Sequence, residues 1–179
     1  MIVRARAPLR LGLAGGGSDV SPFCDLHGGH VMNVTIGMYA YVTLDPSPSG
    51  KAEFHALDAG ASEIVDVGAV ELAAGPLQLM KGVYRCIAER YLGGQAPVLR
   101  IRTHSDAPPG SGLGSSSTMV VALVTAFNEY FSLALGDYDI AHLAFEIERQ
   151  YLGLSGGKQD QYAAAFGGFP DSFSQRLDR

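Results

Sequence analysis

Residues 109–118 read Pro-Gly-Ser-Gly-Leu-Gly-Ser-Ser-Ser-Thr and lie between a β-rich segment at 98–104 and a long apolar segment at 115–135. The glycines allow the backbone to approach an anion closely and to adopt φ angles that other residues avoid. The serines fall in the first turn of the predicted helix, where free amides and the positive end of the helix dipole favour a phosphate group. This stretch therefore predicts a strand, a phosphate-binding loop and a helix in succession.

The two best-known nucleotide loops do not fit this stretch. No lysine follows the glycines as in GxxxxGK[ST], and Ser115 stands where GxGxxG requires its last glycine. A nucleotide-dependent oxidoreductase would need that second pattern, so this enzyme class is disfavoured. A Gly/Ser helix cap without any ligand is the simplest structural alternative.

The rest of the pattern predicts one α+β domain, with a mixed sheet packed by helices. Most strands precede most helices, which argues against a regular βαβ winding. Beyond the central stretch, strands are expected at 2–13, 30–44, 51–57 and 63–67, and helices at 20–26, 77–92, 138–151 and 158–166.

Bulk composition restricts the partners that the protein can have. Of the 179 residues, 47% are hydrophobic, which is enough to bury a core, and the formal net charge is −5. A mildly acidic chain without a run of basic residues gives no reason to expect nucleic acid. No apolar run is long enough for a signal peptide or a membrane span. We expect a cytoplasmic protein without nucleic-acid or membrane partners.

Two carboxylates downstream of the loop are candidates for phosphoryl-transfer chemistry. Transfer to an alcohol uses one carboxylate to hold the metal and another to accept the hydroxyl proton. Glu148 and Asp160 flank a loop that contains Gly153, Gly156 and Gly157. Taken alone, however, Glu148 is typical of a solvated helix position, and Asp160 of an acid that the dipole favours in a first turn.

The 109–118 stretch resembles the second motif of the GHMP kinases, roughly P-x-x-x-G-L-G-S-S. The resemblance implies the fold of the GHMP kinase N-terminal domain, which is ribosomal protein S5 domain 2-like. It implies that Ser116 contacts Mg²⁺, although Ser115 is the neighbour that could take this role instead. The ATP triphosphate is then expected to lie on Pro109, Gly110, Ser111, Gly112, Leu113, Gly114, Ser115, Ser116 and Ser117.

The same resemblance assigns roles to the downstream residues. In galactokinase-like members a metal-binding Glu precedes a Gly-containing loop and a catalytic Asp followed by Gln. Here Glu148 lies twelve residues before the Asp160-Gln161 pair, which matches the family's spacing. Glu148 is therefore implied as the second Mg²⁺ ligand and Asp160 as the base. Lys158 is expected either to favour the charged form of Asp160 or to steady the transferring phosphoryl group, or else to be an exposed lysine at a helix start.

Residues 7–19, Ala-Pro-Leu-Arg-Leu-Gly-Leu-Ala-Gly-Gly-Gly-Ser-Asp, resemble the first motif of this family. The resemblance implies that Arg10 lies near the acceptor hydroxyl and the catalytic Asp. It also implies that Asp19 binds sugar hydroxyls, since a carboxylate can accept two hydrogen bonds from a diol. Taken alone, Arg10 is typical of a strand residue paired with a surface acid, and Asp19 of an N-cap. The expected substrate site consists of Gly16, Gly17, Ser18, Asp19 and His30.

The substrate is suggested by details outside these two motifs. Galactokinases carry Gly-Glu-His-Thr-Asp where this chain has Gly-Gly-Gly-Ser-Asp at 15–19. That loop and the segments 24–31 and 157–169 look most like the D-glycero-D-manno-heptose 7-phosphate kinases. This resemblance, over about 4–169, implies ATP-dependent phosphorylation of the anomeric hydroxyl of a sugar phosphate. Another GHMP activity, such as that of a galactokinase, is the alternative.

The end of the chain departs from the family pattern. GHMP kinases typically have a C-terminal lobe, whereas residues 170–179 do not have the pattern of the strand expected after 167–169. We expect an N-terminal ATP-binding domain at 1–169, a divergent tail at 170–179 and no C-terminal GHMP domain. Such a lone lobe would expose apolar surface, which favours a homo-oligomer. A non-catalytic ATP-binding remnant is therefore a second alternative.

Overall fold

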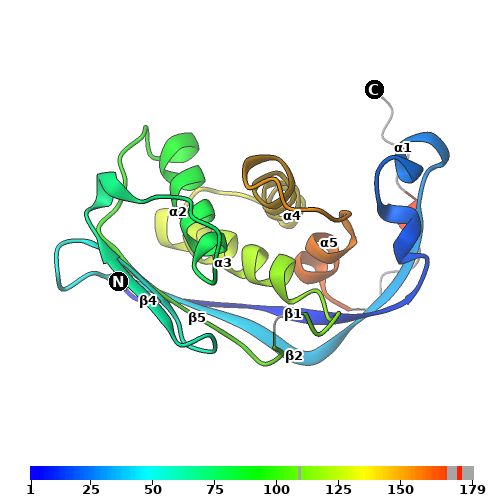
Figure 1. The fold of residues 1–179 in the computed structure, drawn as a ribbon, viewed down its shortest axis with the longest axis horizontal. Helices are drawn as coiled ribbons and strands as arrows, with labels where there is room; N and C mark the ends of the chain where they lie inside the picture. The colour runs from blue at the N-terminus through cyan, green and yellow to red at the C-terminus, as the bar shows by residue number, and fades with distance from the viewer. Residues whose placement is uncertain (109, 169–172, 175–179) are drawn as a thin grey trace.

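The computed structural model describes residues 1–108, 110–168 and 173–174, so Pro109 lies outside the described residues. One mixed sheet forms a layer, and helices cover one of its faces (Figure 1). The strand order is β1-β2-β5-β3-β4, in which β3 and β5 are parallel and the other neighbours are antiparallel. The strands are β1 Val3–Ala14, β2 His30–Pro46, β3 Ala52–Ala56, β4 Ala61–Val65 and β5 Leu99–Ser105.

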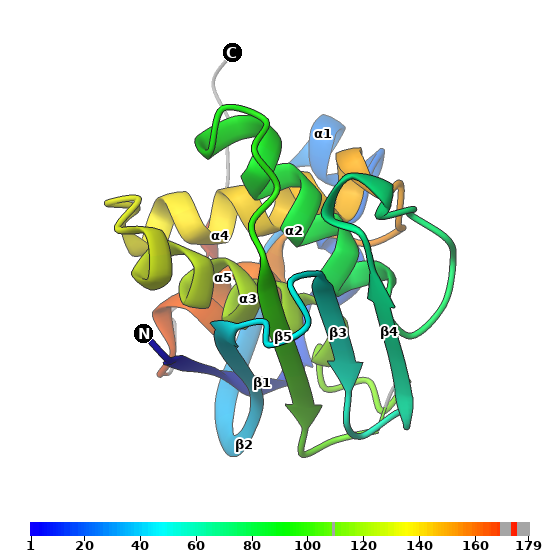
Figure 2. The same cartoon turned by 90° about the vertical axis from the view of Figure 1, so that its left-hand side faces the viewer.

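The helix α3, Ser115–Phe131, is the centre of the core. It packs against β1 and β2 on one side and against the other large helices on the other (Figure 2). Most of its apolar side chains are fully buried, and burying each large one contributes about 1.5–3 kcal/mol. Its helical neighbours are α2 Gln78–Tyr91, α4 Asp137–Phe145 with the π-helical turn η3 Glu146–Tyr151, and α5 Gln159–Phe166.

The β1–β2 pair extends beyond the helical layer and curves at its far end (Figure 1). Register shifts occur between Pro8 and Arg10 and between Gly12 and Ala14, and such irregularities bend a strand pair. The short helices η1 Gly16–Asp19 and α1 Phe23–His27 connect the two strands there. Gly15 has φ 77°, and a Cβ on it would lie 1.8 Å from the carbonyl oxygen of His30. Only glycine can therefore occupy position 15, because any side chain there would collide with the backbone of β2.

The predicted α+β fold is confirmed, with several local differences. The helix expected at 20–26 is α1 at Phe23–His27, and the strand expected at 63–67 is β4 at Ala61–Val65. The helix expected to reach residue 135 ends at Phe131, where Ser132 turns left-handed and the Asn128 side chain binds both backbone groups of Leu135. The helix expected at 138–151 changes to π geometry at Glu146.

A further difference concerns residues 170–179, which lack the sequence pattern of the expected strand. Phe173–Ser174 nevertheless form the short strand β6 and pair with His30 and Val31 of β2, while the assignment of 170–179 as a divergent tail stays a prediction. The other residues of 170–179 lie outside the described part of the chain. Within the described part, no helix combines the length and the apolar character needed to cross a membrane.

Candidate active site

The predicted phosphate loop leads directly into the start of α3. Gly110, Gly112 and Gly114 have φ of 79°, 75° and 74°, so the loop uses glycine wherever its backbone turns left-handed. No side chain caps α3, and its first helical hydrogen bond runs from the Thr118 amide to Gly114 O at 2.9 Å. In the described residues, the amides of 115–117 therefore have no acceptor. Free amides at a helix N-terminus suit an anion such as a phosphate.

Glu148 reaches this helix start from η3. Its Oε1 accepts a hydrogen bond from Ser116 Oγ at 2.6 Å, and its Oε2 accepts one from Ser117 Oγ at 2.6 Å. Gln161 Nε2, on α5, donates to Oε2 at 2.7 Å and to Ser117 Oγ at 3.1 Å. Glu148 is only 1% exposed, so these donors replace the water that a carboxylate would otherwise need. The solvated-helix alternative for Glu148 is therefore wrong.

Arg149 provides the positive charge beside Glu148. Its Nη1 lies 3.3 Å from Glu148 Oε1, and its Nη2 donates to Ser117 Oγ at 3.3 Å. The same guanidinium donates to Ser155 O at 2.8 Å and to Gly157 O at 3.3 Å. Arg149 thus ties the loop before α5 to the Glu148 carboxylate. Glu148 and Arg149 are adjacent in the sequence, and both reach this site from the π-helical turn η3. Such π-helical turns are often found at functional sites.

Arg10 and Asp160 form the second half of the site. Arg10 Nε and Nη2 lie 2.7 and 2.6 Å from Asp160 Oδ1, while Nη1 donates to Gly112 O at 2.6 Å. The Arg10 amide also donates to Leu113 O at 3.1 Å, which fixes β1 against the phosphate loop. A Cβ on Gly114 would lie 3.3 Å from Asp160 Cγ, so the carboxylate sits against the head of α3. The predicted proximity of Arg10 and Asp160 is confirmed.

Asp19 binds protein amides at the start of α5. Its Oδ2 accepts hydrogen bonds from the Lys158 amide at 2.6 Å and from the Gln159 amide at 2.8 Å. Burial raises the pKa of Asp19, and the Asp160 charge raises it further, while the two amide bonds oppose the rise. A Cβ on Gly157 would lie 2.0 Å from Asp19 Oδ2, so the contact depends on that glycine. Asp19 therefore caps a distant helix through Oδ2, and no hydrogen bond to its Oδ1 is present among the described residues.

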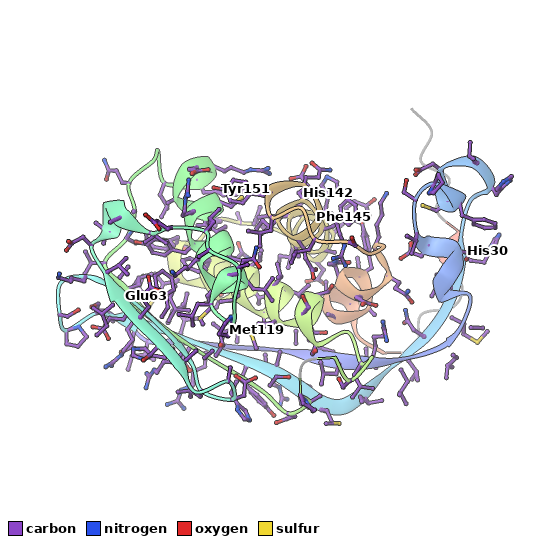
Figure 3. All side chains as sticks on the ribbon, in the orientation of Figure 1. His30, Glu63, Met119, His142, Phe145 and Tyr151 are labelled. Carbon is purple, nitrogen blue, oxygen red and sulfur yellow. The ribbon has the colours of Figure 1, made fainter. Side chains whose placement is uncertain are left out.

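The other expected substrate residues border this contact. Ser18 Oγ has two possible acceptors for its one hydrogen, Gly15 O at 2.7 Å and His30 O at 3.0 Å, and it accepts a hydrogen bond from the His30 amide at 3.1 Å. The backbone of His30, the first residue of β2, thus holds the loop that contains Ser18 in place (Figure 3). A Cβ on Gly16 would lie 3.2 Å from Gln159 Nε2, whereas one on Gly17 would meet nothing within 4 Å. Roles in sugar binding stay predictions.

Lys158 does not pair with the carboxylate of Asp160. Its Nζ lies 5.2 Å from the ring centroid of Phe145, which Figure 3 labels on α4. The backbone amide of Lys158, by contrast, takes part in the Asp19 contact. A role of this side chain in phosphoryl transfer stays a prediction.

The oxygen donors at the head of α3 fit the expected nucleotide and metal. A hydroxyl and a carboxylate suit Mg²⁺, which usually takes one or two carboxylates and completes its shell with waters and phosphates. Among the described residues, no group of three or more His, Cys, Asp and Glu side chains gathers to enclose a metal. The pair Ser116 and Glu148 therefore fits an ion that shares its ligands with a bound phosphate.

Two residues of this site are missing from the sequence-based prediction. Gln161 is fully buried and binds Glu148, and its place directly after Asp160 was a signal that could have revealed it. Arg149 had no such signal, because an arginine on a helix next to a glutamate is typical of a solvated surface. Only the tertiary structure brings its guanidinium to the loop carbonyls.

The comparisons with known proteins agree with this fold. The profile of the GHMP kinases N terminal domain matches residues 78–168, so the chain belongs to the GHMP kinase family. It is 45% identical over 93% of its length to the D-glycero-alpha-D-manno-heptose 7-phosphate kinase of Campylobacter jejuni, and covers 49% of that protein. It is 27% identical over 92% of its length to a galactokinase of Thermotoga neapolitana, of which it covers 44%.

A solved structure of a related protein has the same fold. The D-glycero-D-manno-heptose 1-phosphate kinase from Bacteroides thetaiotaomicron superimposes with a TM-score of 0.88 and 49% identity. That match covers 99% of this chain and 60% of the other. The chain thus spans about half the length of the curated relatives that it matches.

Proposed function

We propose that this domain binds ATP and Mg²⁺ at the head of α3 and belongs to an enzyme that phosphorylates a sugar phosphate. The observation that carries the proposal is the convergence of Glu148 and Asp160 on the start of that helix, from two different elements. Ser116 binds Glu148 at 2.6 Å, and a Cβ on Gly114 would lie 3.3 Å from Asp160 Cγ. A helix cap without a ligand would not require two acids there.

Each side chain has a defined task in this proposal. The loop amides and the dipole of α3 hold the triphosphate. Ser116 and Glu148 would hold Mg²⁺, which neutralises phosphate charge when bound. Asp160 accepts the proton of the acceptor hydroxyl, and Arg10 fixes the orientation of its carboxylate through Oδ1. Lys158 is proposed to stabilise the transferring phosphoryl group.

The proposed acceptor is the anomeric hydroxyl of D-glycero-D-manno-heptose 7-phosphate. The support is the 45% identity to a relative with that name, compared with 27% to a galactokinase. The triple glycine at 15–17 in place of the galactokinase pattern points the same way. Use of ATP favours a cytoplasmic location, which stays a prediction.

Calorimetry and a turnover assay on the same preparation test the proposal. A non-hydrolysable ATP analogue with Mg²⁺ should bind one site, and ADP release should follow addition of heptose 7-phosphate but not of galactose or homoserine. Failure of the analogue to bind would reject the nucleotide site itself. Binding without turnover on any acceptor would instead favour a non-catalytic ATP-binding domain.

A further inference from the structure

The sheet face opposite the helices carries an arginine-rich surface. Figures 1 and 2 show helices on only one side of the sheet. The strand register places Arg4, Thr43 and Arg102 side by side on β1, β2 and β5. Two residues away along each strand, it places Arg6, Tyr41 and His104 side by side in the same way. Because side chains alternate between faces along a strand, these residues lie on the side away from buried neighbours such as Val42 and Ile101.

Part of this face is hollowed into a pocket of about 250 Å³. This volume is near the lower end of small-molecule sites, roughly 300–1,000 Å³. The sheet separates the pocket from the head of α3, so a ligand here would leave the candidate active site open. The pocket is lined by Arg4, Tyr41, Thr43, Leu57, Arg102, Thr103 and His104.

The charges around the pocket leave a local positive excess. Arg102 Nη2 lies 2.9 Å from Asp45 Oδ1, but Asp45 also binds Arg100, so two cations share one carboxylate. Within the described part of the chain, no acid lies within 4.0 Å of Arg4, and Arg102 Nε is buried without an acceptor. This arrangement occurs in a chain whose net charge is −5, where an arginine without an ion-pair partner next to one that shares its carboxylate needs an explanation.

The other acids on this face are already engaged. Asp106 Oδ2 accepts hydrogen bonds from the Tyr39 amide at 2.8 Å and from Tyr41 Oη at 3.3 Å. Glu53 Oε1 accepts hydrogen bonds from two serine hydroxyls at 2.7 Å. Both carboxylates keep their charge, and Asp106 Oδ1 lies 3.8 Å from His104 Nε2, but neither forms an ion pair with Arg4 in the described part of the chain.

The walls of the pocket suit a ligand with a carbon body. The rings of Tyr41 and His104 stack with centroids 6.2 Å apart, and Leu57 is 62% exposed at the rim. Thr43 stands between the two arginines in the register and offers a hydroxyl. Two guanidinium groups and a hydroxyl are the donors that typically bind a phosphate group.

We propose that this pocket binds a small phosphate monoester, with the phosphate on Arg4, Thr43 and Arg102 and the carbon body on Leu57 and the Tyr41 ring. The site is distinct from the one at the head of α3 and does not depend on the proposed kinase function. Its ligand class is a phosphorylated metabolite of sugar size.

Amide chemical-shift mapping with glucose 6-phosphate, inorganic phosphate and glucose tests this site. The Mg²⁺-bound ATP analogue is kept saturating, so that phosphate does not enter at α3. Glucose 6-phosphate should shift the amides around Arg4, Thr43 and Arg102 rather than those around the candidate active site, and glucose should shift none of them. If inorganic phosphate and the ester bound with equal affinity, the pocket would recognise only an anion, and the proposal of a phosphate monoester as its ligand would be rejected. Shifts confined to 110–117 would also reject it.

Matched variants separate the pocket from general charge. Arg4→Ala should weaken ester binding about tenfold, which is the loss of one charge-assisted contact. Arg6→Ala is the control, because Arg6 lies on the same strand and face but outside the pocket lining, over the Tyr39 ring. Equal losses in both variants would contradict a local site. If Arg4→Ala fails to fold, Leu57→Asp places an acid at the exposed rim and should give the same loss.

Discussion

Arg10 places two guanidinium nitrogens 2.6 and 2.7 Å from a single oxygen of Asp160, a residue 150 positions away in the sequence. The third nitrogen of that guanidinium binds the carbonyl of Gly112 in the phosphate loop. One side chain therefore holds β1, the loop and α5 together. Arg10 contacts only Oδ1 of that carboxylate, and we expect the other oxygen of Asp160 to face the acceptor hydroxyl in the proposed reaction.

Asp160→Asn tests the role of this carboxylate as the base. The amide keeps the shape of the side chain but cannot accept a proton, so kcat should fall by about 10²–10⁴-fold. Binding of the ATP analogue should change little, because the loop amides and Glu148 are untouched. ADP release and calorimetry measure the two effects separately. Unchanged turnover in Asp160→Asn would reject the base assignment.

Glu148→Gln tests the buried network at the head of α3. Loss of the charge leaves Arg149 without its counter-ion in a buried position, which should lower the free energy of unfolding by about 3 kcal/mol. The apparent affinity for Mn²⁺, used as a spectroscopic probe in the presence of the nucleotide, should fall as well. Urea unfolding and Mn²⁺ titration measure the two quantities.

Glu146→Gln is the matched control for that variant. Glu146 lies on the same turn but forms an ion pair with Arg90 at the surface, where a loss of less than about 1 kcal/mol is expected. If the two variants lost equal stability and equal Mn²⁺ affinity, Glu148 would have no special place in the site.

Arg149→Lys tests whether this guanidinium positions the loop before α5. Lysine keeps the positive charge but cannot hold Glu148, Ser155 and Gly157 at once, because it lacks the planar set of donors. Amide exchange at 155–158 should speed up, and KM for the acceptor should rise more than KM for ATP. Arg85→Lys, in the exposed pair with Glu89, should change neither quantity. Protected loop amides in Arg149→Lys would contradict the positioning role.

The raised pKa of Asp19 predicts how the stability of the fold depends on pH. Its pKa in the folded protein is raised above the ordinary 3.8, mainly by burial, so the folded state binds the proton more tightly than the unfolded chain. Stability from this group is therefore present below pH 3.8 and is lost as the pH rises through the folded-state pKa. Urea unfolding between pH 4 and 7 should show wild type losing stability relative to Asp19→Asn as the pH increases. A constant difference would contradict the shift.

The sequence was sufficient for most of the elements and for the position of the glycine-rich loop, for two physical reasons. Hydrophobic periodicity is local, so the helices near 77–92 and 158–166 could be placed within a residue or two. Glycines with no alternative backbone conformation, such as Gly114, mark the phosphate loop in the sequence itself.

Contacts between distant segments could not be predicted in the same way. The cap that Asp19 makes on α5 spans about 140 residues, and nothing local distinguishes it from a cap on its own helix. The hydrogen bonds of Arg149 to loop carbonyls depend on the π-helical turn, which has no signature in residues 146–151. The sequence therefore suggests which side chains matter, and the fold determines which of them meet.

Gly114→Ala tests the close approach between the loop and the base. Alanine at φ 74° is strained, and its Cβ would lie 3.3 Å from Asp160 Cγ and 3.5 Å from Arg10 Cγ. Stability should fall by more than about 1 kcal/mol, and turnover should fall further because the Arg10–Asp160 pair must shift. Gly112→Ala separates strain from contact, since its φ is 75° but its Cβ would meet nothing within 4 Å. Thermal unfolding should report similar strain in both, whereas the loss of kcat should be larger in Gly114→Ala. Equal kcat in the two variants would show that the approach to Asp160 has no part in catalysis.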